Sequence, residues 1–313
     1  MRNWGESDIP DQTGKRVLVT GGASGIGYEA ARALAEQGAH VIIADRNMEA
    51  GAAAVQRIRT KRPDAVVEFR PLDLGSLKAV RDFAAALLVE GQVLDTLINN
   101  AGIQPISERR TSADGFELTF AIGHLGHFAL TGLLLRLLER SVAGRIVTVS
   151  SMVHGGGKFD WDDLQMTKAY SSQRAYNQTK LANLLFAREL AARLERLGSK
   201  LRSIAVHPGV AQTSIGANRK QLGAFHLGDY MVSAVLSLVM PFLGQPASAG
   251  ALPTMFAASA EGAVNGGFFG PDGFGEMKGA PAPARIKPAA QDMAAAARLW
   301  AVTEKLTGLS YLD

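Results

Sequence analysis

Two side chains with acid–base chemistry, Tyr176 and Lys180, are four residues apart in a stretch whose pattern predicts a helix from about Arg174 to Leu197. Side chains four residues apart on a helix share one face. A tyrosine near its free pKa of about 10 exchanges protons poorly at neutral pH, but a nearby ammonium stabilises the phenolate. The spacing therefore predicts Tyr176 as a general acid/base assisted by Lys180. A solvent-facing Tyr–Lys pair is the alternative.

A glycine-rich stretch, residues 20–27, follows an apolar run and leads into the helical pattern Ile26–Gln37. Gly21 and Gly25 allow the backbone to turn tightly and approach a pyrophosphate, and Gly27 allows the helix to pack closely on the strand. The helix N-terminus offers free N–H groups and a positive dipole end to phosphates. This strand–turn–helix context predicts a dinucleotide site. The residues expected to contact the cofactor here are Gly21, Ser24, Gly25, Ile26 and Gly27.

The next apolar run, Val41–Ala44, is followed directly by Asp45 and Arg46. An acidic side chain at this place can accept hydrogen bonds from the ribose hydroxyls of NAD and would repel the 2′-phosphate of NADP. A guanidinium can hold that phosphate, so Arg46 argues for NADP. We expect NAD to be favoured, with NADP as the other candidate. The alternative for the pair is a solvated turn.

Strand-like and helix-like patterns alternate from Arg16 onward, and the strands read as continuous apolar runs. Such runs indicate burial on both faces of a parallel sheet. The alternation predicts an α/β fold with a Rossmann-type, doubly wound parallel sheet. We expect a single domain over residues 1–313, with a core at about 14–275 and a C-terminal extension at 276–313. Further strands are expected at Val66–Phe69, Thr96–Ile98, Arg145–Ser150 and Arg202–His207, and further helices at Met48–Arg59, Leu77–Leu88, Phe116–Leu138 and Asp292–Thr307.

The composition fits a soluble globular protein, with 47% hydrophobic and 20% charged residues. The net charge of +4 comes without a block of like charge, which argues against a nucleic-acid partner. The lack of cysteine excludes disulfides, thiolate metal sites and a cysteine nucleophile, and suits the cytoplasm, where we expect the protein. Residues Met1–Lys15 lack the apolar core of a signal peptide.

The most apolar later stretch, Met231–Leu243, is too short to span a bilayer and contains Pro241. We expect a core or pocket helix there, with contact to a membrane surface as the alternative. The segment Pro281–Pro288 is rich in Pro and Ala and is expected to run over the surface.

Ordered motifs along nearly the whole chain resemble the classical short-chain dehydrogenase/reductase family. They are Thr20–Gly27, Asp73-Leu74, Asn99–Gly102, Ser150-Ser151, Tyr176–Lys180, Pro208-Gly209 and Thr213. Within that family the sequence is most similar to the retinol-dehydrogenase-like branch. That similarity lies in the stretches His124–Phe128, Asp163–Gln165, Tyr176–Asn183 and Ala297–Trp300. Each motif alone is modest evidence, and their common order is strong evidence.

The resemblance implies an NAD(P)-dependent oxidoreductase that moves a hydride between the cofactor and an alcohol or carbonyl. Tyr176 would be the general acid/base, Lys180 would also bind the nicotinamide ribose, and Ser151 would hold the substrate oxygen. A homodimer or homotetramer would form through the helices that contain His127 and Lys180, although the tail after Pro281 could block one interface. The remaining cofactor contacts, each of which also fits a purely structural turn residue, would be Asp73, Leu74, Asn100, Ala101, Gly102, Pro208, Gly209, Val210 and Thr213.

One position departs from the family pattern, because Gly123 stands where the family carries an asparagine. That asparagine usually holds a water that connects the lysine to solvent, and glycine has no side chain for this role. A backbone carbonyl or an extra water could substitute, or the site could be adapted to an unusual substrate. The chain could also bind cofactor without useful turnover. This last reading gives the alternative function, a sensor or regulatory protein of the same fold.

Four histidines lie near these motifs. His124 and His127 have the i,i+3 spacing of some metal ligands, but no third ligand is evident in the sequence. We therefore expect core or interface histidines and no metal site. His154 and His207 lie close to the predicted site, and His154, beside three glycines, could touch the substrate.

Apolar side chains are dense after Thr213, where the fold is expected to place a lid over the substrate. They predict a pocket for a hydrophobic alcohol or carbonyl, such as a retinoid-like or steroid-like molecule. A helix buried against the domain or against another subunit is the alternative. The residues are Phe225, Leu227, Tyr230, Met231, Val235, Leu236, Leu238, Val239, Met240 and Phe242.

Overall fold

The structure, a computed structural model, describes residues 4–212 and 244–312. Thr213, the stretch Met231–Leu243 and the predicted lid residues between Phe225 and Phe242 lie outside the described residues. The expectations for those positions stay predictions.

Eight strands of the described chain form one sheet in the order β10-β9-β6-β5-β4-β1-β2-β3. All neighbouring pairs are parallel except β10 and β9, which pair antiparallel at one edge. The order reverses next to β1, as in a doubly wound sheet, so the predicted fold class is confirmed. The strands are β1 (Arg16–Thr20), β2 (His40–Asp45), β3 (Val67–Pro71), β4 (Thr96–Asn99), β5 (Arg145–Val149), β6 (Arg202–Val206), β9 (Phe268–Pro271) and β10 (Pro281–Pro283), with β7 (Ala211–Gln212) and β8 (Gln245–Pro246) as a separate pair.

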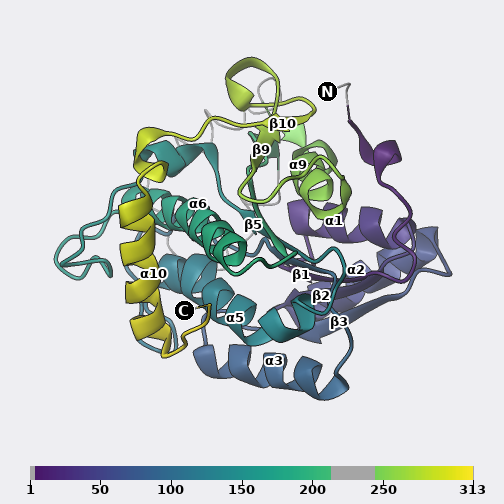
Figure 1. Cartoon of the computed structure of the whole chain (residues 1–313), viewed down its shortest axis with the longest axis horizontal. Coiled ribbons are helices and arrows are strands. Elements are labelled where there is room, and N and C mark those ends of the chain that lie inside the picture. The colour runs from purple at the N-terminus through teal and green to yellow at the C-terminus, as the bar shows by residue number, and fades with distance from the viewer. Residues whose placement is uncertain (1–3, 213–243, 313) are drawn as a thin grey trace.

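Helices cover both faces of this sheet (Figure 1). One face carries α1 (Gly25–Glu36), α2 (Met48–Lys61) and α9 (Ala247–Ser259). The other carries α3 (Leu77–Glu90), α5 (Gly126–Leu138) and α6 (Ser172–Arg196). Successive residues of β1 serve the two cores, since Val17 and Val19 pack on the α1 side and Leu18 on the α3 side. This double burial explains the unbroken apolar runs of the strands.

The predicted helix Phe116–Leu138 is interrupted. It begins as the short helix α4 (Leu118–Phe120), passes through a π-helical turn at Ala121–Leu125 and continues as α5. Gly123 lies in the π-helical turn, and a Cβ at this position would be 2.5 Å from Cγ2 of Thr179 on α6. Carbon atoms pack best at about 3.5–4.0 Å, so the missing side chain allows the turn to lie directly against α6.

The stretch Leu118–Leu138 is the one helix in the described part of the chain that is long and apolar enough to cross a membrane. Its most apolar window is 78% buried inside the protein, as for the core helix of a globular domain. The most apolar later stretch of the sequence, residues 231–243, lies outside the described residues.

The expectation that Pro281–Pro288 runs over the surface was wrong for its first part. Residues 281–283 form β10, and Pro281 is buried at the sheet edge. Within these three residues Ala282 alone has a backbone N–H to donate, because both of its neighbours are prolines. Antiparallel pairing with β9, which ends ten residues earlier in the chain, makes this segment a strand, and the composition of the segment gives no sign of that pairing.

The last helix, α10 (Met293–Thr307), lies along α6 (Figure 1). Its Trp300 is 2% exposed, with ring centroids 5.0 Å from Phe128 of α5 and 5.8 Å from Phe186 of α6. The guanidinium of Arg193 lies 4.4 Å from the centre of the indole. The chain's own C-terminal helix therefore covers the face of α5 and α6 that contains Phe128 and Phe186.

Candidate active site

The carboxyl ends of β1, β4, β5 and β6 meet at one edge of the sheet, because these strands are parallel neighbours. Ser151 follows β5 there, and Tyr176 and Lys180 lie near the start of α6. The hydroxyl of Ser151 lies near that of Tyr176, close enough to lower its pKa. Nζ of Lys180 is 5.6 Å from the centre of the Tyr176 ring. The structure thus brings together the predicted general acid/base Tyr176, its supporting Lys180 and Ser151, which is expected to hold the substrate oxygen.

Lys180 is buried, and its Nζ donates to the carbonyl oxygen of Val149 at 3.3 Å. Asn183 Nδ2 donates to the same oxygen at 3.1 Å. Burial lowers the pKa of Lys180 to about 8, because the ammonium loses solvation. Burial also raises the pKa of Tyr176, whereas the nearby Ser151 hydroxyl lowers it. In this structure burial, and not Lys180, is therefore the main influence on the phenol.

The glycine turn has the geometry that a pyrophosphate requires. Gly21 and Gly25 have φ angles of +65° and +57°, which favour glycine. A Cβ at Gly27 would collide with the carbonyl oxygen of Gly21 and with Nδ2 of Asn100. Ser24 is the N-cap of α1, but its side chain makes no cap hydrogen bond. The first N–H groups of α1 are therefore left for a phosphate, and these residues fit a bound dinucleotide.

Thr20, the last residue of β1, links this turn to α5. Its Oγ1 accepts the N–H groups of Asn100 at 2.9 Å and Ala101 at 3.0 Å and lies 2.9 Å from Nε2 of His127. His127 Nδ1 lies 3.1 Å from the carbonyl oxygen of Gly123, which can only accept, so Nδ1 carries the proton and Nε2, which faces the Thr20 hydroxyl, is unprotonated. The carbonyl of Gly123, one candidate to replace the missing asparagine, is thus already bonded to His127.

His124 lies in the core, 1% exposed, with its ring against Phe120 and Phe186. Its Nε2 is 3.0 Å from Oγ1 of Thr303 on α10. Burial lowers the pKa of His124 to about 3 and that of His127 to about 4, so both rings are neutral at neutral pH. Within residues 4–212 and 244–312, no group of three His, Asp or Glu side chains is arranged to hold a metal ion.

The residues predicted on the adenosine side lie at the ends of β2 and β3. Asp45 is half-buried and its Oδ1 accepts the N–H of Asn47 at 3.0 Å, whereas the neighbouring Arg46 is exposed. Asp73 Oδ1 accepts the N–H of Gly75 at 2.8 Å. Each carboxylate therefore stabilises the turn that follows it by accepting the N–H two residues later in the chain. This is the purely structural alternative given for both residues in the sequence analysis.

Two further predicted positions allow helices and side chains to approach closely. The carbonyl of the buried Leu74 would collide with a Cβ at Gly126, the first residue of α5. A Cβ at Gly102 would lie 3.7 Å from Nζ of Lys180, so this glycine borders the lysine without crowding it. Asn100 Nδ2 donates to the carbonyl oxygen of Thr20 at 2.8 Å and thereby fixes the glycine turn.

The predicted nicotinamide loop, Pro208–Val210, is held by the C-terminal part of the chain. The N–H of Val210 donates to the carbonyl oxygen of Met277 at 2.8 Å, and a Cβ at Gly209 would collide with that same oxygen. The carbonyl of Pro208 accepts from Nε2 of Gln245 at 2.9 Å. Sequence reasoning did not identify Met277 or Gln245, because both contacts join segments far apart in the chain.

The expectation that His154 could touch the substrate is not met in this structure. His154 is 1% exposed, and both ring nitrogens lie against backbone groups, Nδ1 at 2.7 Å from the carbonyl oxygen of Ser151 and Nε2 at 3.2 Å from the amide of Lys287. His207 is also fully buried, with Nε2 at 3.1 Å from Oε2 of Glu276. The sequence gave no indication of the partners Lys287 and Glu276.

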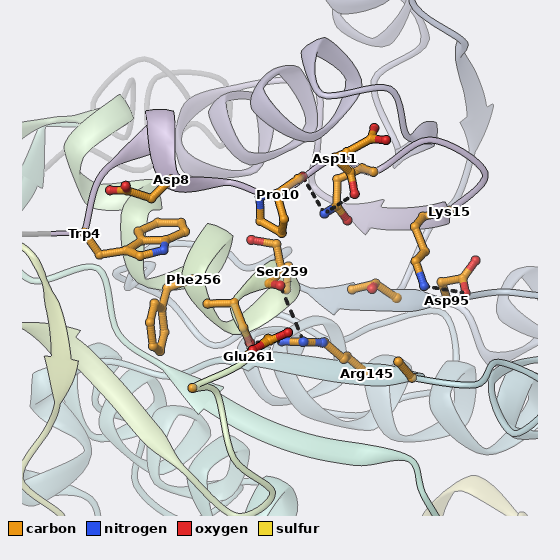
Figure 2. Close-up of a pocket in the computed structure, with 16 residues that line it drawn as sticks. Trp4, Asp8, Pro10, Asp11, Lys15, Asp95, Arg145, Phe256, Ser259 and Glu261 are labelled. Atoms are coloured by element: carbon orange, nitrogen blue, oxygen red, sulfur yellow. Dashed lines mark hydrogen bonds and ion pairs between the residues drawn. The ribbon is translucent and has the colours of Figure 1, made fainter.

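A pocket of about 680 Å³ lies at the opposite edge of the sheet, among residues that precede β1, β4 and β5 (Figure 2). Trp4 and Phe256 close one end, and Lys15 pairs with Asp95 at the other, 3.9 Å apart. Between them the buried Arg145 donates to carbonyl oxygens at the end of α9, among them that of Ala260 at 2.7 Å. These contacts join the end of α9 to the start of β5, far from Tyr176.

The sequence matches the family described as short chain dehydrogenase over residues 15–222. The chain belongs to this family. It is 41% identical to human retinol dehydrogenase 13 over 299 residues, covering 95% of this chain and 85% of that protein. It is 45% identical to zebrafish (Danio rerio) polyprenol dehydrogenase over 215 residues, covering 67% and 66% of the two chains. The resemblance to the retinol-dehydrogenase-like branch is confirmed.

Solved structures agree with this assignment. A crystal structure of an uncharacterised protein from Mycobacterium paratuberculosis has a TM-score of 0.80 and 37% identity, and covers 99% of both chains. A short-chain dehydrogenase from Shigella flexneri complexed with NADP has a TM-score of 0.62 at 22% identity, covering 83% of this chain and 98% of that one, and shows a shared fold. The protein is therefore an oxidoreductase that acts on CH–OH groups with NAD or NADP as the hydride acceptor.

Proposed function

We propose that the protein oxidises a hydrophobic alcohol, or reduces the matching carbonyl, with Tyr176 as the general acid/base. The observation that carries the proposal is the placement of Tyr176 near Ser151, with Lys180 beside the Tyr176 ring and the glycine turn at the same edge of the sheet. Two neighbouring hydroxyl groups can both bond one substrate oxygen.

In the direction of oxidation, Ser151 donates a hydrogen bond to the alcohol oxygen and Tyr176 takes the hydroxyl proton. The bound nicotinamide supplies the acceptor for the hydride that leaves the carbinol carbon, so the carbonyl product and the reduced cofactor balance the reaction. In the reverse direction Tyr176 donates its proton to the carbonyl oxygen. The raised pKa of Tyr176 keeps the phenol protonated at neutral pH, the form that this reverse step requires.

Lys180 supports the proton transfer through its charge. With a pKa of about 8 it is mainly protonated at pH 7, and an ammonium near the phenol stabilises the phenolate as the proton leaves. The residues that would hold the cofactor are those of the glycine turn with Asp45, Asp73, Asn100 and the loop Pro208–Val210. Thr213 is part of the same proposal but lies outside the described residues.

For the substrate we favour a long apolar alcohol of the retinoid or polyprenol type. The relatives named retinol dehydrogenase and polyprenol dehydrogenase support this class, as does the density of apolar residues between Phe225 and Phe242. A soluble cytoplasmic enzyme remains our expectation, with contact to a membrane surface as the alternative for delivery of such a substrate.

The cofactor preference is tested by fluorescence titration with NADH and NADPH. We expect tighter binding of NADH, because the carboxylate of Asp45 repels a 2′-phosphate. Asp45→Ala should then improve NADPH binding, and Arg46→Ala, the matched change at the next residue, should weaken it. Tighter binding of NADPH by the unaltered protein would show that Arg46 outweighs Asp45.

Turnover decides between the enzyme and the sensor function considered for a chain with Gly123. The enzyme should reduce NAD or NADP in the presence of long-chain alcohols, and this reaction should disappear in Tyr176→Phe. Cofactor binding without turnover, and the appearance of turnover in a Gly123→Asn variant, would instead favour the sensor.

A further inference from the structure

The two ring nitrogens of His154 hold two different segments of backbone. Nδ1 lies 2.7 Å from the carbonyl oxygen of Ser151, and Nε2 lies 3.2 Å from the backbone nitrogen of Lys287. A carbonyl oxygen can only accept and a backbone N–H can only donate. The contacts therefore require a neutral ring with its proton on Nδ1.

The contact with Ser151 fixes a residue of the candidate active site. Ser151 is the N-cap of the short helix Met152–Gly156, and its Oγ accepts the N–H of Val153 at 3.4 Å. Its carbonyl oxygen accepts both the backbone N–H of His154 at 3.1 Å and Nδ1–H of the ring. The hydroxyl and the carbonyl group of Ser151 are thus both held by hydrogen bonds, and these bonds fix the orientation of the side chain beside Tyr176.

The contact with Lys287 fastens the segment 284–287, which joins β10 to the turn before α10. The N–H of Ala284 donates to the carbonyl of Phe268 at 2.8 Å, and the N–H of Arg285 donates to Oε1 of Glu276 at 2.9 Å. The other oxygen of Glu276 lies 3.1 Å from Nε2 of His207. His154 and Glu276 therefore tie one segment to both sides of the site, to Ser151 and to His207 before the loop Pro208–Val210.

We propose that His154 is a positioning residue, which in its neutral form aims the hydroxyl of Ser151 at the substrate oxygen and locks the segment 284–287 over this part of the site. The inference rests on the proposed function, because it assigns Ser151 the role of holding that oxygen.

Protonation of His154 removes the hydrogen bond from the Lys287 N–H to Nε2. A second ring proton on Nε2 would face the N–H of Lys287, and two donors cannot bond each other. The groups that face the ring are the ammonium of Lys287, the carboxylate of Glu276, the imidazole of His207 and, edge to face, the ring of Phe268 with centroids 5.4 Å apart. Burial lowers the pKa of His154, with Lys287 acting in the same direction and Ser151 and Glu276 opposing it. Both contacts of His154 are therefore intact at neutral pH, and the one to Lys287 is lost only in acid, below the usual range of a histidine.

Two substitutions separate the two contacts. In His154→Asn the amide nitrogen takes the place of Nδ1 and can still donate to Ser151, but nothing reaches Lys287. In His154→Gln the amide oxygen takes the place of Nε2 and can still accept from Lys287, but the donor to Ser151 is lost. His40→Gln, at a half-exposed histidine on β2 paired with Glu68, is the control.

The readouts are kcat over pH and the hydrogen exchange of the Lys287 amide, measured on the full chain. We expect His154→Gln to lower kcat roughly fivefold and to keep the amide protected, since one lost hydrogen bond is worth about 1 kcal/mol. We expect His154→Asn to keep kcat within about threefold of the parent and to expose the amide at neutral pH, whereas the parent should expose it only in acid. His40→Gln should leave kcat, its pH profile and the amide unchanged.

Unchanged kcat in His154→Gln, or a protected Lys287 amide in His154→Asn, would overturn the inference while the proposed function stood. If the parent chain binds cofactor but turns over no alcohol, the proposed function fails and the positioning role of His154 fails with it.

Discussion

Gly123 and Thr179 should be energetically coupled, because a side chain at the glycine has no room beside the threonine. A Cβ at Gly123 would lie 2.5 Å from Cγ2 of Thr179, about 1 Å closer than carbon atoms normally pack. Thr179 cannot easily turn away, since its Oγ1 donates to the carbonyl of Ala175 at 2.8 Å and the residue is 1% exposed. Gly123→Ala must therefore push α6 and the π-helical turn apart.

The size of the coupling follows from two opposing effects. Overpacking of a well-filled core costs about 1–3 kcal/mol, whereas replacing a helical glycine by alanine gains about 1 kcal/mol in helix propensity. Gly123→Ala alone should therefore range from neutral to about 2 kcal/mol destabilising. In a Thr179→Ser background the methyl group is gone while the hydroxyl remains, so the same substitution should become neutral or stabilising. The two changes should thus be coupled by about 1–3 kcal/mol.

The assay is urea unfolding of the parent, the two single variants and the double variant, each extrapolated to water. Thr179→Ser supplies the matched control, since it removes Cγ2 without introducing a clash. Free energies of unfolding that add to within about 0.5 kcal/mol would refute the reasoning. Gly123 would then not be required by its packing against α6, and its presence would need another cause.

Three further predictions follow from the packing and from the buried groups. Gly27→Ala should abolish dinucleotide binding in a fluorescence titration, because the new methyl collides with the Gly21 carbonyl. Gly22→Ala should keep measurable binding, because its Cβ would lie 3.1 Å from Cγ2 of Ile43 and 3.2 Å from the carbonyl oxygen of Val19, contacts that small shifts relieve. Equal affinities would contradict this account. Trp300→Ala should lower the free energy of unfolding by about 3–5 kcal/mol, and a loss below about 1 kcal/mol would mean that α10 is not part of the core. Acid should destabilise the fold from pH 6.5 toward 4, because the unfolded chain takes up protons on three histidines that burial keeps neutral in the folded chain. The free energy of unfolding should fall by up to about 4 kcal/mol per pH unit. Urea unfolding free energies that stay constant over this range would be inconsistent with the burial of His124, His127 and His207.

Much of the fold could be predicted because its signals are local. The strands β1, β2, β4, β5 and β6 are buried on both faces, and most of them read as apolar runs. The glycine turn lies directly between the first strand and the first helix. Spacing alone places Tyr176 and Lys180 on one face of α6. These features depend on residues within a few positions of one another, so the sequence displays them directly.

The remaining features depend on contacts that no local sequence pattern displays. β10 consists of two prolines around one alanine and is a strand only because β9 lies beside it. The bond between His154 and Lys287 spans 133 residues. The π-helical turn at Gly123 also escaped prediction, because apolar periodicity indicates a helix but does not distinguish a local change in its winding.

The central claim is that Tyr176 carries the proton in a reaction that transfers hydride between a long apolar alcohol and a nicotinamide cofactor. The most direct test compares the parent and Tyr176→Phe in the reduction of NAD and NADP with such an alcohol, after cofactor titration has shown that both bind equally well. We predict turnover by the parent and its loss in Tyr176→Phe. Undiminished turnover in Tyr176→Phe would contradict the account.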